Sequence, residues 1–184
     1  VRYHLRRGDS AQIHKLLHSG SVRLGFVGAM LEPDSMTYFP MLEDHLVMCT
    51  ANNPHYQALK KQNVYGRDLL REPTVAREEG SGTDRTVQSY MRNMGLADQD
   101  LHIVARVDDP EAIKRMTAQG VGVSVLSALS VASEVDDGRL LTFPMDPQGL
   151  HRSIYLVYPR ETILSQSEQT FVRFCRQMAI RRNL

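Results

Sequence analysis

The residues best suited to chemistry lie in the stretch REEGSGT at residues 77–83. An apolar segment precedes this stretch and a helical pattern follows it, so the chain passes from a strand to a helix through two glycines, a serine and a threonine. Glycine lets the backbone approach a ligand closely, and the N–H groups that open a helix attract anions. Ser81, Gly82 and Thr83 are therefore candidates for binding an anion.

A capped turn is the alternative interpretation of the same stretch. Ser81 or Thr83 could be the N-cap of the following helix. A cap satisfies only one or two of the N–H groups at a helix start, so capping and ligand binding are compatible. The stretch lacks the Gly-Lys-Ser/Thr of a P-loop and the third glycine of a dinucleotide fingerprint, so neither nucleotide motif is predicted.

Other strand-to-helix passages are candidates for the same kind of site. Ser10 opens a helix that follows a strand expected at residues 1–6, and Val125 lies at the end of an apolar segment. Asp109 opens another helix but fits a plain N-cap, since its charge would repel an anion. Gly28 and Ala29 end a predicted strand, where small residues either leave room for a ligand or allow tight packing.

Metal and catalytic sites are not predicted. His14 and His18 share one helical face, as zinc ligands do, but no third ligand accompanies them. The chain has no Gly-x-Ser-x-Gly motif, and Cys49 and Cys175 lie in apolar patterns, where a thiol is usually inert packing. We therefore expect no metal, no cofactor and no enzymatic activity.

The composition is that of a globular protein with one domain or two small lobes. The chain has 184 residues, 42% of them hydrophobic and 23% charged, with a formal net charge of +1. So small a net charge gives no strong attraction to nucleic acid or to a membrane surface. Both cysteines lie in apolar segments, which favours buried thiols in a reducing compartment.

The ends of the chain and its apolar runs carry further expectations. No apolar run approaches the roughly 20 residues of a membrane span. The start VRYHLRR lacks the apolar core of a secretion signal. The chain begins on Val1 inside an alternating pattern, so we expect that a further segment precedes it.

Strand-like and helix-like segments alternate along the chain. The expected strands are short and rich in Val, Ile and Leu, and they lie at residues 22–29, 45–50, 73–78, 101–107, 121–126, 139–143 and 153–158. Helices are expected to begin at residues 9–10, near 83, at 109–110, after 127 and at 165. The segment from 56 to 70 fits either a helix or a loop. This alternation predicts an α/β fold with a largely parallel sheet, whose ligands lie at the carboxyl ends of the strands.

Six segments follow one another in a characteristic order: GDSAQIHKLLHSGSVRLGFVGA, LEDHLVMCTANNPHY, REEGSGT, DDPEAIKRMTAQGVGVSVLS, GRLLTFP and SIYLVYPRE. In this order and spacing they resemble the effector-binding domain of LysR-type transcriptional regulators, over nearly the whole chain. REEGSGT is similar to the branch that contains regulators of cysteine biosynthesis and of carbon fixation. Each segment alone is weakly specific, so the resemblance depends on their shared order.

The resemblance implies a two-lobed fold like that of type II periplasmic binding proteins, each lobe a mixed, mostly parallel sheet flanked by helices. Residues 1–46 with 157–184 would form the first lobe and residues 47–156 the second, joined by two crossing strands. The residues that would line the cleft by position are Ser10, Gly28 and Ala29 from the first lobe, and Ser81, Gly82, Thr83 and Val125 from the second.

This sequence also departs from the family pattern. The N-terminal winged helix-turn-helix, the linker helix and the first strand–helix unit of the effector domain are absent from it. Asp84 occupies a position where the REEGSGT branch often has arginine, a difference that bears on the charge of the ligand.

The sequence therefore favours the effector-sensing domain of a LysR-type regulator. The implied protein is cytoplasmic and non-enzymatic, and it binds a small anionic metabolite in the cleft between its lobes. It associates as a homodimer or tetramer through this domain, contacts no membrane, and contacts DNA only through the absent N-terminal domain. The alternative on the same fold is the solute-binding protein of a transport system. A small hydrolase or transferase is disfavoured because no nucleophile–base pair is evident.

Overall fold

The computed structural model describes residues 2–182, apart from the side chains of Asp98, Arg181 and Arg182. The chain forms two compact units. Unit 1 runs to Glu43 and also contains Gly80–Gly82 and the chain from Ser153 onward, whereas unit 2 contains Asp44–Glu79 and Thr83–Arg152. The assignment of two effector-binding lobes to residues 1–46 with 157–184 and to 47–156 stays a prediction.

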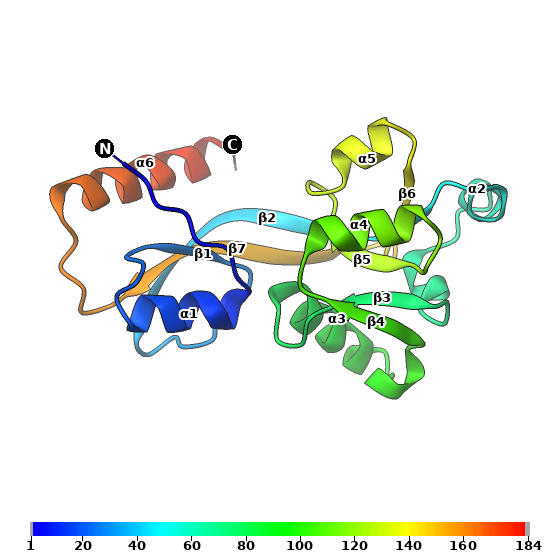
Figure 1. The fold of residues 1–184 in the computed structure, drawn as a ribbon, viewed down its shortest axis with the longest axis horizontal. Coiled ribbons are helices and arrows are strands. Elements are labelled where there is room, and N and C mark those ends of the chain that lie inside the picture. The colour runs from blue at the N-terminus through cyan, green and yellow to red at the C-terminus, as the bar shows by residue number, and fades with distance from the viewer. Residues whose placement is uncertain (1, 183–184) are drawn as a thin grey trace. The chain divides into compact units, whose positions relative to one another are not determined.

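Unit 1 is built from α1 (Ser10–His18), β1 (Gly25–Val27), α6 (Gln166–Arg182) and parts of two long strands, β2 (Met36–Ala51) and β7 (Leu150–Pro159) (Figure 1). Asp9 caps α1: its carboxylate accepts the N–H of Gln12 at 2.8 Å, and the Gln12 side chain completes a capping box. Helix α1 packs on β1. This unit buries two apolar clusters, one of Ile13, Leu17, Val27, Met36 and Val157 and the other of Leu156, Val172 and Cys175.

The elements between β2 and β7 alternate between helices and strands. They are α2 (Pro54–Lys61), η1 (Gly66–Leu69), β3 (Thr74–Arg77), α3 (Gly82–Asn93), η2 (Asp98–Asp100), β4 (Ile103–Val107), α4 (Pro110–Ala118), β5 (Ser124–Ser127), α5 (Ala132–Asp136) and β6 (Leu140–Pro144). Helix α4 packs on β3, β4 and β5, and α5 packs on β6 (Figure 1). Unit 2 buries one apolar cluster around Met48 and Phe143 and a second around Val75 and Ile113.

The strands form a five-stranded sheet and a two-stranded sheet. The larger sheet has the order β1-β7-β2-β5, with β6 also paired to β2. Strand β1 is antiparallel to β7, and β2 is antiparallel to both β5 and β6. Strands β3 and β4 are parallel, and Thr74 forms a further parallel bridge to Val123.

The α/β class is confirmed, and the seven strands expected between residues 22 and 158 and the five expected helices are present. The strand expected at residues 1–6 is not formed: residues 2–6 have no regular secondary structure. The sequence predicts that parallel pairing dominates. Of the pairs β1–β7, β2–β5, β2–β6 and β3–β4, however, only β3–β4 is parallel, and the one bridge of Thr74 to Val123 is also parallel. The reason is that β2 and β7 extend well beyond the expected segments 45–50 and 153–158. Strand β2 pairs antiparallel with β5 and β6, and β7 pairs antiparallel with β1. The segment from 56 to 70 contains most of α2 and all of η1.

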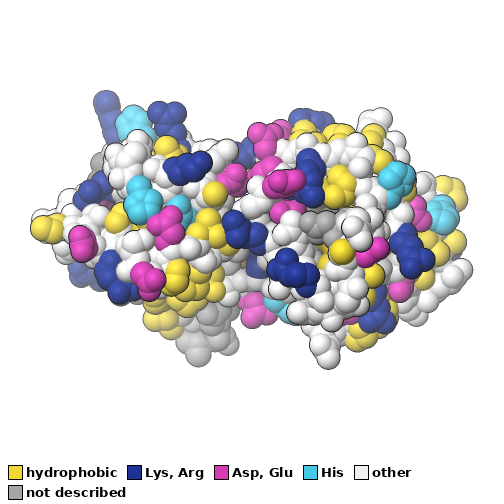
Figure 2. Space-filling view, turned by 90° about the horizontal axis from the view of Figure 1, so that it is seen from below, with side chains coloured by type: hydrophobic (Ala, Val, Ile, Leu, Met, Phe, Trp, Pro, Cys, Tyr) yellow, Lys and Arg dark blue, Asp and Glu magenta, His cyan; other side chains and the backbone are white. Residues whose placement is uncertain are grey.

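Charged side chains of both signs are interspersed over each unit on the face shown in Figure 2. This mixture is what a formal net charge of +1 requires when 23% of the residues are charged. Of the helices within residues 2–182, none combines the length and the apolar character needed to cross a bilayer.

Candidate functional site

The passage from β3 to α3 forms as the sequence predicts. Strand β3 ends at Arg77 and α3 begins at Gly82. Gly80 has a φ of 82°, in the region that residues with a side chain rarely adopt, so the turn depends on this glycine. Ser81 and Thr83 are only 1% and 3% exposed. The start of α3 is therefore an ordered, buried structure in which the hydroxyl groups have defined neighbours.

The hydroxyl of Thr83 is held by an arginine from a distant strand. Nη1 of Arg152, on β7, donates to Oγ1 of Thr83 at 2.9 Å. The same guanidinium binds Oδ2 of Asp44, on β2, through Nε at 2.9 Å and Nη2 at 2.8 Å. Ser127 at the end of β5 donates to Oδ1 of Asp44 at 2.6 Å. These four side chains form one hydrogen-bonded network in unit 2.

Asp44 is the buried charge on which this network depends. It is 3% exposed, and a carboxylate so deeply buried needs a partner for its charge and acceptors. Alternation along β2 places Asp44 on the same inward face as Leu46 and Met48, so the carboxylate cannot turn toward water. Asp44, Ser127 and Arg152 are not predicted from the sequence. The available signal was a carboxylate at a position where the strand pattern calls for an apolar side chain.

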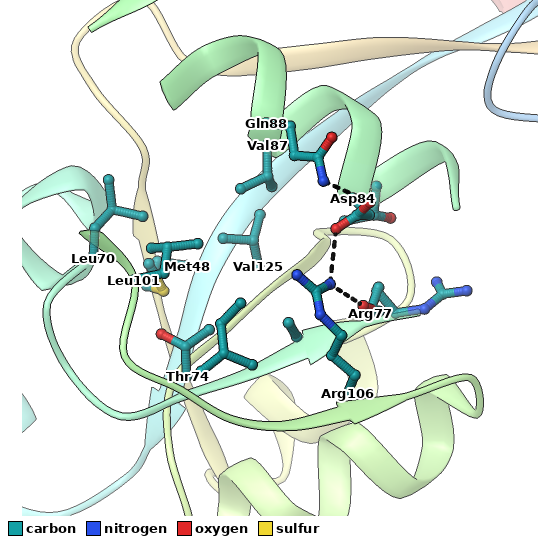
Figure 3. A pocket seen from close by; sticks show the side chains of 13 residues that line it. Met48, Leu70, Thr74, Arg77, Asp84, Val87, Gln88, Leu101, Arg106 and Val125 are labelled. Atoms are coloured by element: carbon teal, nitrogen blue, oxygen red, sulfur yellow. Dashed lines mark hydrogen bonds and ion pairs between the residues drawn. The ribbon is translucent and has the colours of Figure 1, made fainter. Parts of the chain in front are cut away.

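A second network surrounds Asp84, one residue after Thr83. Oδ1 of Asp84 lies 3.1 Å from Nη1 of Arg106 on β4, which also donates to the carbonyl oxygen of Arg77 at 3.1 Å (Figure 3). The side chain of Gln88 donates to Oδ2 of Asp84 at 3.2 Å. Asp84 is 8% exposed, and its charge is balanced by Arg106. The aspartate at this position therefore does not by itself repel an anion.

A small cavity lies between these groups and the core of unit 2. Its volume is about 40 Å³, enough for a few water molecules and too small for a metabolite. Figure 3 shows Met48, Val87 and Val125 on its apolar wall, with Asp84 and Arg106 on the polar side. Thr83 also lines it. The structure thus brings two of the predicted residues, Thr83 and Val125, to one recess in unit 2.

Three arginine–carboxylate pairs neutralise most side-chain charge near the start of α3. They are Arg152–Asp44, Arg106–Asp84 and Arg77–Glu78. None of these six side chains is more than 28% exposed. Glu79 lies 3.7 Å from Arg106 but is 79% exposed, so water screens it. With these charges paired, the partial positive charge of roughly half an elementary unit at the α3 N-terminus favours an anion.

The remaining predicted residues lie in unit 1 or beside Thr83. Ser81 and Gly82 directly precede Thr83 and belong to unit 1 by their contacts. Ser10 is the first residue of α1 and is 5% exposed, whereas Gly28 and Ala29 follow the end of β1. Because no ligand is present, the roles of these residues in binding stay predictions.

Structural surroundings account for His14, His18 and the two cysteines. Nδ1 of His14 contacts the carbonyl oxygen of Ser10 and Nε2 contacts the hydroxyl of Tyr38, so both ring nitrogens are engaged. The ring of His18 pairs with Glu32. Burial raises the pKa of the Cys49 thiol to about 12 and also raises the pKa of Cys175. Thiols with raised pKa values are poor nucleophiles at neutral pH.

Comparison with known proteins identifies the family. The model of the LysR substrate binding domain matches residues 1–179, and the chain belongs to this family. It is a family of ligand-sensing domains of transcriptional regulators, which is not an enzyme class. The fold expected from the resemblance, that of type II periplasmic binding proteins, is confirmed.

Three curated relatives illustrate the range of the family. The transcriptional activator CmpR of Synechocystis is 27% identical over 92% of this chain and 54% of its own length. The RuBisCO operon transcriptional regulator of Allochromatium vinosum is 27% identical over 91% and 54%. The phosphonates import ATP-binding protein PhnC of Anaeromyxobacter dehalogenans is 27% identical over 96% of this chain but only 35% of its own length. The chain thus spans about half or less of these relatives.

Two solved structures with bound ligands have the same fold. The CcmR regulatory domain of Synechocystis in complex with 2-PG has a TM-score of 0.79 and 25% identity, covering 93% of this chain and 80% of that one. The effector-binding domain of QuiR in complex with shikimate has a TM-score of 0.81 and 16% identity, covering 95% and 79%. At 16% identity the second match supports the fold alone.

Proposed function

We propose that this chain is the effector-sensing domain of a LysR-type transcriptional regulator and that it binds a small anionic metabolite at the start of α3. The observation that carries the proposal is the Thr83 hydroxyl, which Arg152 holds in place at a helix N-terminus whose neighbouring charges are paired. A similar domain, the CcmR regulatory domain, is described in complex with 2-PG, which supports a small ligand for this chain as well.

The residues proposed to contact the effector come from several elements. Thr83 and Val125 lie at one recess, and Ser81 and Gly82 form the turn that leads to it. Those from unit 1 are Ser10, Gly28 and Ala29. An effector changes the conformation of its receptor only to the extent that it binds one state more tightly than another. In the full-length regulator this difference would be transmitted to DNA binding.

The partners and location follow from the same proposal. A regulator of this family would act in the cytoplasm, assemble as a homodimer or tetramer through this domain, and contact DNA through a separate N-terminal domain. The mixed surface charge of both units is consistent with a domain that leaves DNA binding to another part of the protein.

Calorimetry with the isolated chain tests the proposal. The titrants are 2-PG, shikimate and sulfate, and the proteins are wild type and Thr83→Val, which keeps the side-chain shape and removes the hydroxyl. We expect at least one anion to bind wild type and the variant to bind it about tenfold more weakly, as for one lost hydrogen bond to a charged group. Equal affinity of both proteins would remove Thr83 from the site.

The transport alternative has less support. One relative carries a phosphonate-import name and matches 96% of this chain, but this chain corresponds to only 35% of that relative's length. It corresponds to 54% of the length of CmpR and of the RuBisCO operon regulator, which are transcriptional regulators. The coding sequence upstream of Val1 separates the two. A helix-turn-helix pattern there supports the regulator, and an apolar secretion signal supports transport.

A further inference from the structure

We infer that His45 and His151 form a binding site for a divalent transition-metal ion of the zinc, nickel or copper class on the surface of unit 2. The inference goes beyond the proposed function, because neither histidine is among the residues proposed to contact the effector. The two side chains come from β2 and β7, which are neighbours in the five-stranded sheet. Both are exposed, so an ion can reach them from solvent.

The two imidazole rings lie close enough to share one ion. Their centroids are 4.4 Å apart with the ring planes at 73°, and a ring nitrogen of His45 lies within 4.8 Å of a ring nitrogen of His151. Zinc bonds imidazole nitrogen at about 2.0–2.1 Å, so two nitrogens on one ion are at most about 4.2 Å apart. Because both side chains are exposed, rotation about their χ angles can bring the nitrogens to that distance while the strands stay in place.

A backbone carbonyl sets the tautomer of His151. Nε2 of this ring lies 3.0 Å from the carbonyl oxygen of Gln148. Because a carbonyl oxygen only accepts hydrogen bonds, Nε2 carries the proton, and in the neutral ring the lone pair is on Nδ1. Histidines that bind metals usually donate their other N–H to such an oxygen, which fixes the orientation of the ring. Nδ1 is therefore the nitrogen that His151 offers to an ion.

The turn before β7 holds this carbonyl in place. Gly149 has a φ of 76°, and the N–H of Gln148 donates to Oδ1 of Asp146 at 2.9 Å. A Cβ built at position 149 would lie 2.8 Å from Nε2 of His151. The glycine therefore both allows the turn and leaves room for the imidazole.

Strand alternation turns the two rings away from the core. Asp44 directly precedes His45, Arg152 directly follows His151, and these two buried or largely buried side chains form the ion pair described above. Successive side chains of a strand point to opposite faces, so the histidines leave the same two strands on the other face. An ion bound by both rings would add a second link between β2 and β7 beside the Asp44–Arg152 pair.

The ligand atoms select the class of metal. Imidazole suits zinc, nickel and copper ions, whereas magnesium and calcium prefer oxygen ligands. Glu43, exposed two positions before His45, adds a carboxylate to the same face of β2. The pair His14 and His18 differs, because its rings contact Tyr38 and Glu32. His45 and His151 lie on strands far apart in the chain, so their spacing in the sequence does not predict the pair.

Calorimetric titration with zinc chloride tests the site. The proteins are wild type without a polyhistidine tag, His45→Ala, His151→Ala and the control His102→Ala, which removes an exposed histidine of the same unit. We expect wild type to bind one zinc ion per chain and each of the two ligand variants to bind it at least about tenfold more weakly, since even the loss of a group that only orients a ligand costs 10–100-fold. His102→Ala should bind as wild type does, and magnesium chloride should give no binding at the same concentration.

The side-chain signals of the histidines give a second measurement that needs no variant. In proton–carbon NMR spectra of wild type, the ring signals of His45 and His151 should shift together and saturate at one equivalent of zinc. Zinc affinity that is equal in wild type, His45→Ala and His151→Ala overturns the inference, as does zinc that shifts the ring of only one of the two. If an alanine variant does not fold, the ring signals of wild type decide. Each of these outcomes leaves the proposed effector site at the start of α3 untouched.

Discussion

The guanidinium of Arg152 lies 2.9 Å from the hydroxyl of Thr83, although 69 positions of sequence separate the two residues. Thr83 lies at a helix start that the sequence predicts to contact a ligand. Arg152 lies on β7, and the sequence does not predict that it takes part in the site. Asp44 on β2 anchors that arginine. The start of α3 is thus positioned by two strands as well as by its own turn, which gives the proposed effector site its fixed geometry.

Removing the Asp44 carboxylate should strongly destabilise the protein. In Asp44→Ala the Arg152 guanidinium keeps its charge in a site that is 16% exposed and loses its partner, which costs about 3–5 kcal/mol in the free energy of unfolding for a broken buried pair. Urea unfolding measures this difference. Asp136 is an exposed carboxylate in the same unit. The control variant Asp136→Ala should therefore change the free energy of unfolding by no more than about 0.5 kcal/mol. A similarly small loss for Asp44→Ala would show that the network does not stabilise the fold.

The start of α6 should make stability depend on pH in the acid range. The backbone N–H of Ser165 and the side chain of Arg23 outweigh the effect of burial and hold the pKa of Glu168 below its ordinary value of 4.5. A carboxylate with a lowered pKa in the folded state contributes stability above the unfolded-state pKa and loses it as pH falls through the folded-state pKa. The free energy of unfolding of wild type should therefore exceed that of Glu168→Gln by its full amount above pH 4.5, and this difference should shrink below pH 4.5.

Urea unfolding of both proteins between about pH 6 and pH 3 measures this advantage directly. The control is Glu161→Gln, since Glu161 is an exposed carboxylate in the same unit. The free energy of unfolding of Glu161→Gln should differ little from that of wild type at every pH of the series. A constant difference between wild type and Glu168→Gln across the series would contradict the assignment.

A methyl group at position 122 should disturb the parallel bridge in unit 2. A Cβ built on Gly122 would lie 2.4 Å from the carbonyl oxygen of Pro73, which is backbone and cannot rotate away. That same oxygen accepts the N–H of Val123 at 2.7 Å. We expect Gly122→Ala to lower the free energy of unfolding by about 1–3 kcal/mol, the usual cost of overpacking.

Thermal unfolding compares Gly122→Ala with Val121→Ala. Val121 is 45% exposed, so its truncation should cost little. A Gly122→Ala protein as stable as the Val121→Ala protein would mean that the strands at this bridge separate without penalty.

The two cysteines should be unreactive in the folded protein. Cys49 is fully buried with a pKa raised to about 12, and burial also raises the pKa of Cys175. Because the thiolate is the reactive form, a chromogenic disulfide reagent near pH 8 should label neither thiol in native protein and both in denaturant. Rapid labelling of one thiol under native conditions would contradict the packing around it.

The sequence predicts the order of elements well because caps and apolar runs are local. Asp9 with Gln12 and Asp109 with Pro110 mark helix starts through neighbours within a few residues, and both caps are present. The strands at β2 and β7 are less well predicted. Their extra length depends on antiparallel partners far along the chain, and Pro40 within β2 gives no local sign of a continuous strand.

The candidate site is predicted only in part, for the same reason. Thr83 belongs to a recognisable turn, and its burial confirms that the turn is ordered. Its partner Arg152 lies 69 positions further along the chain. Asp44, which anchors Arg152, lies 108 positions before Arg152. A local sequence pattern does not indicate such distant pairs. A buried carboxylate on an apolar strand face was the one local sign of the network.

Amide chemical shifts during a titration with 2-PG, or with the anion that calorimetry selects, test the placement of the effector site most directly. If the effector binds at the start of α3, the N–H signals of Gly82, Thr83 and Asp84 shift most, saturate with the calorimetric affinity, and respond weakly in Thr83→Val. Saturable binding that leaves these three amides unmoved and shifts others, such as those of Arg67 and Met91 at a different cavity of unit 2, would contradict the proposed site.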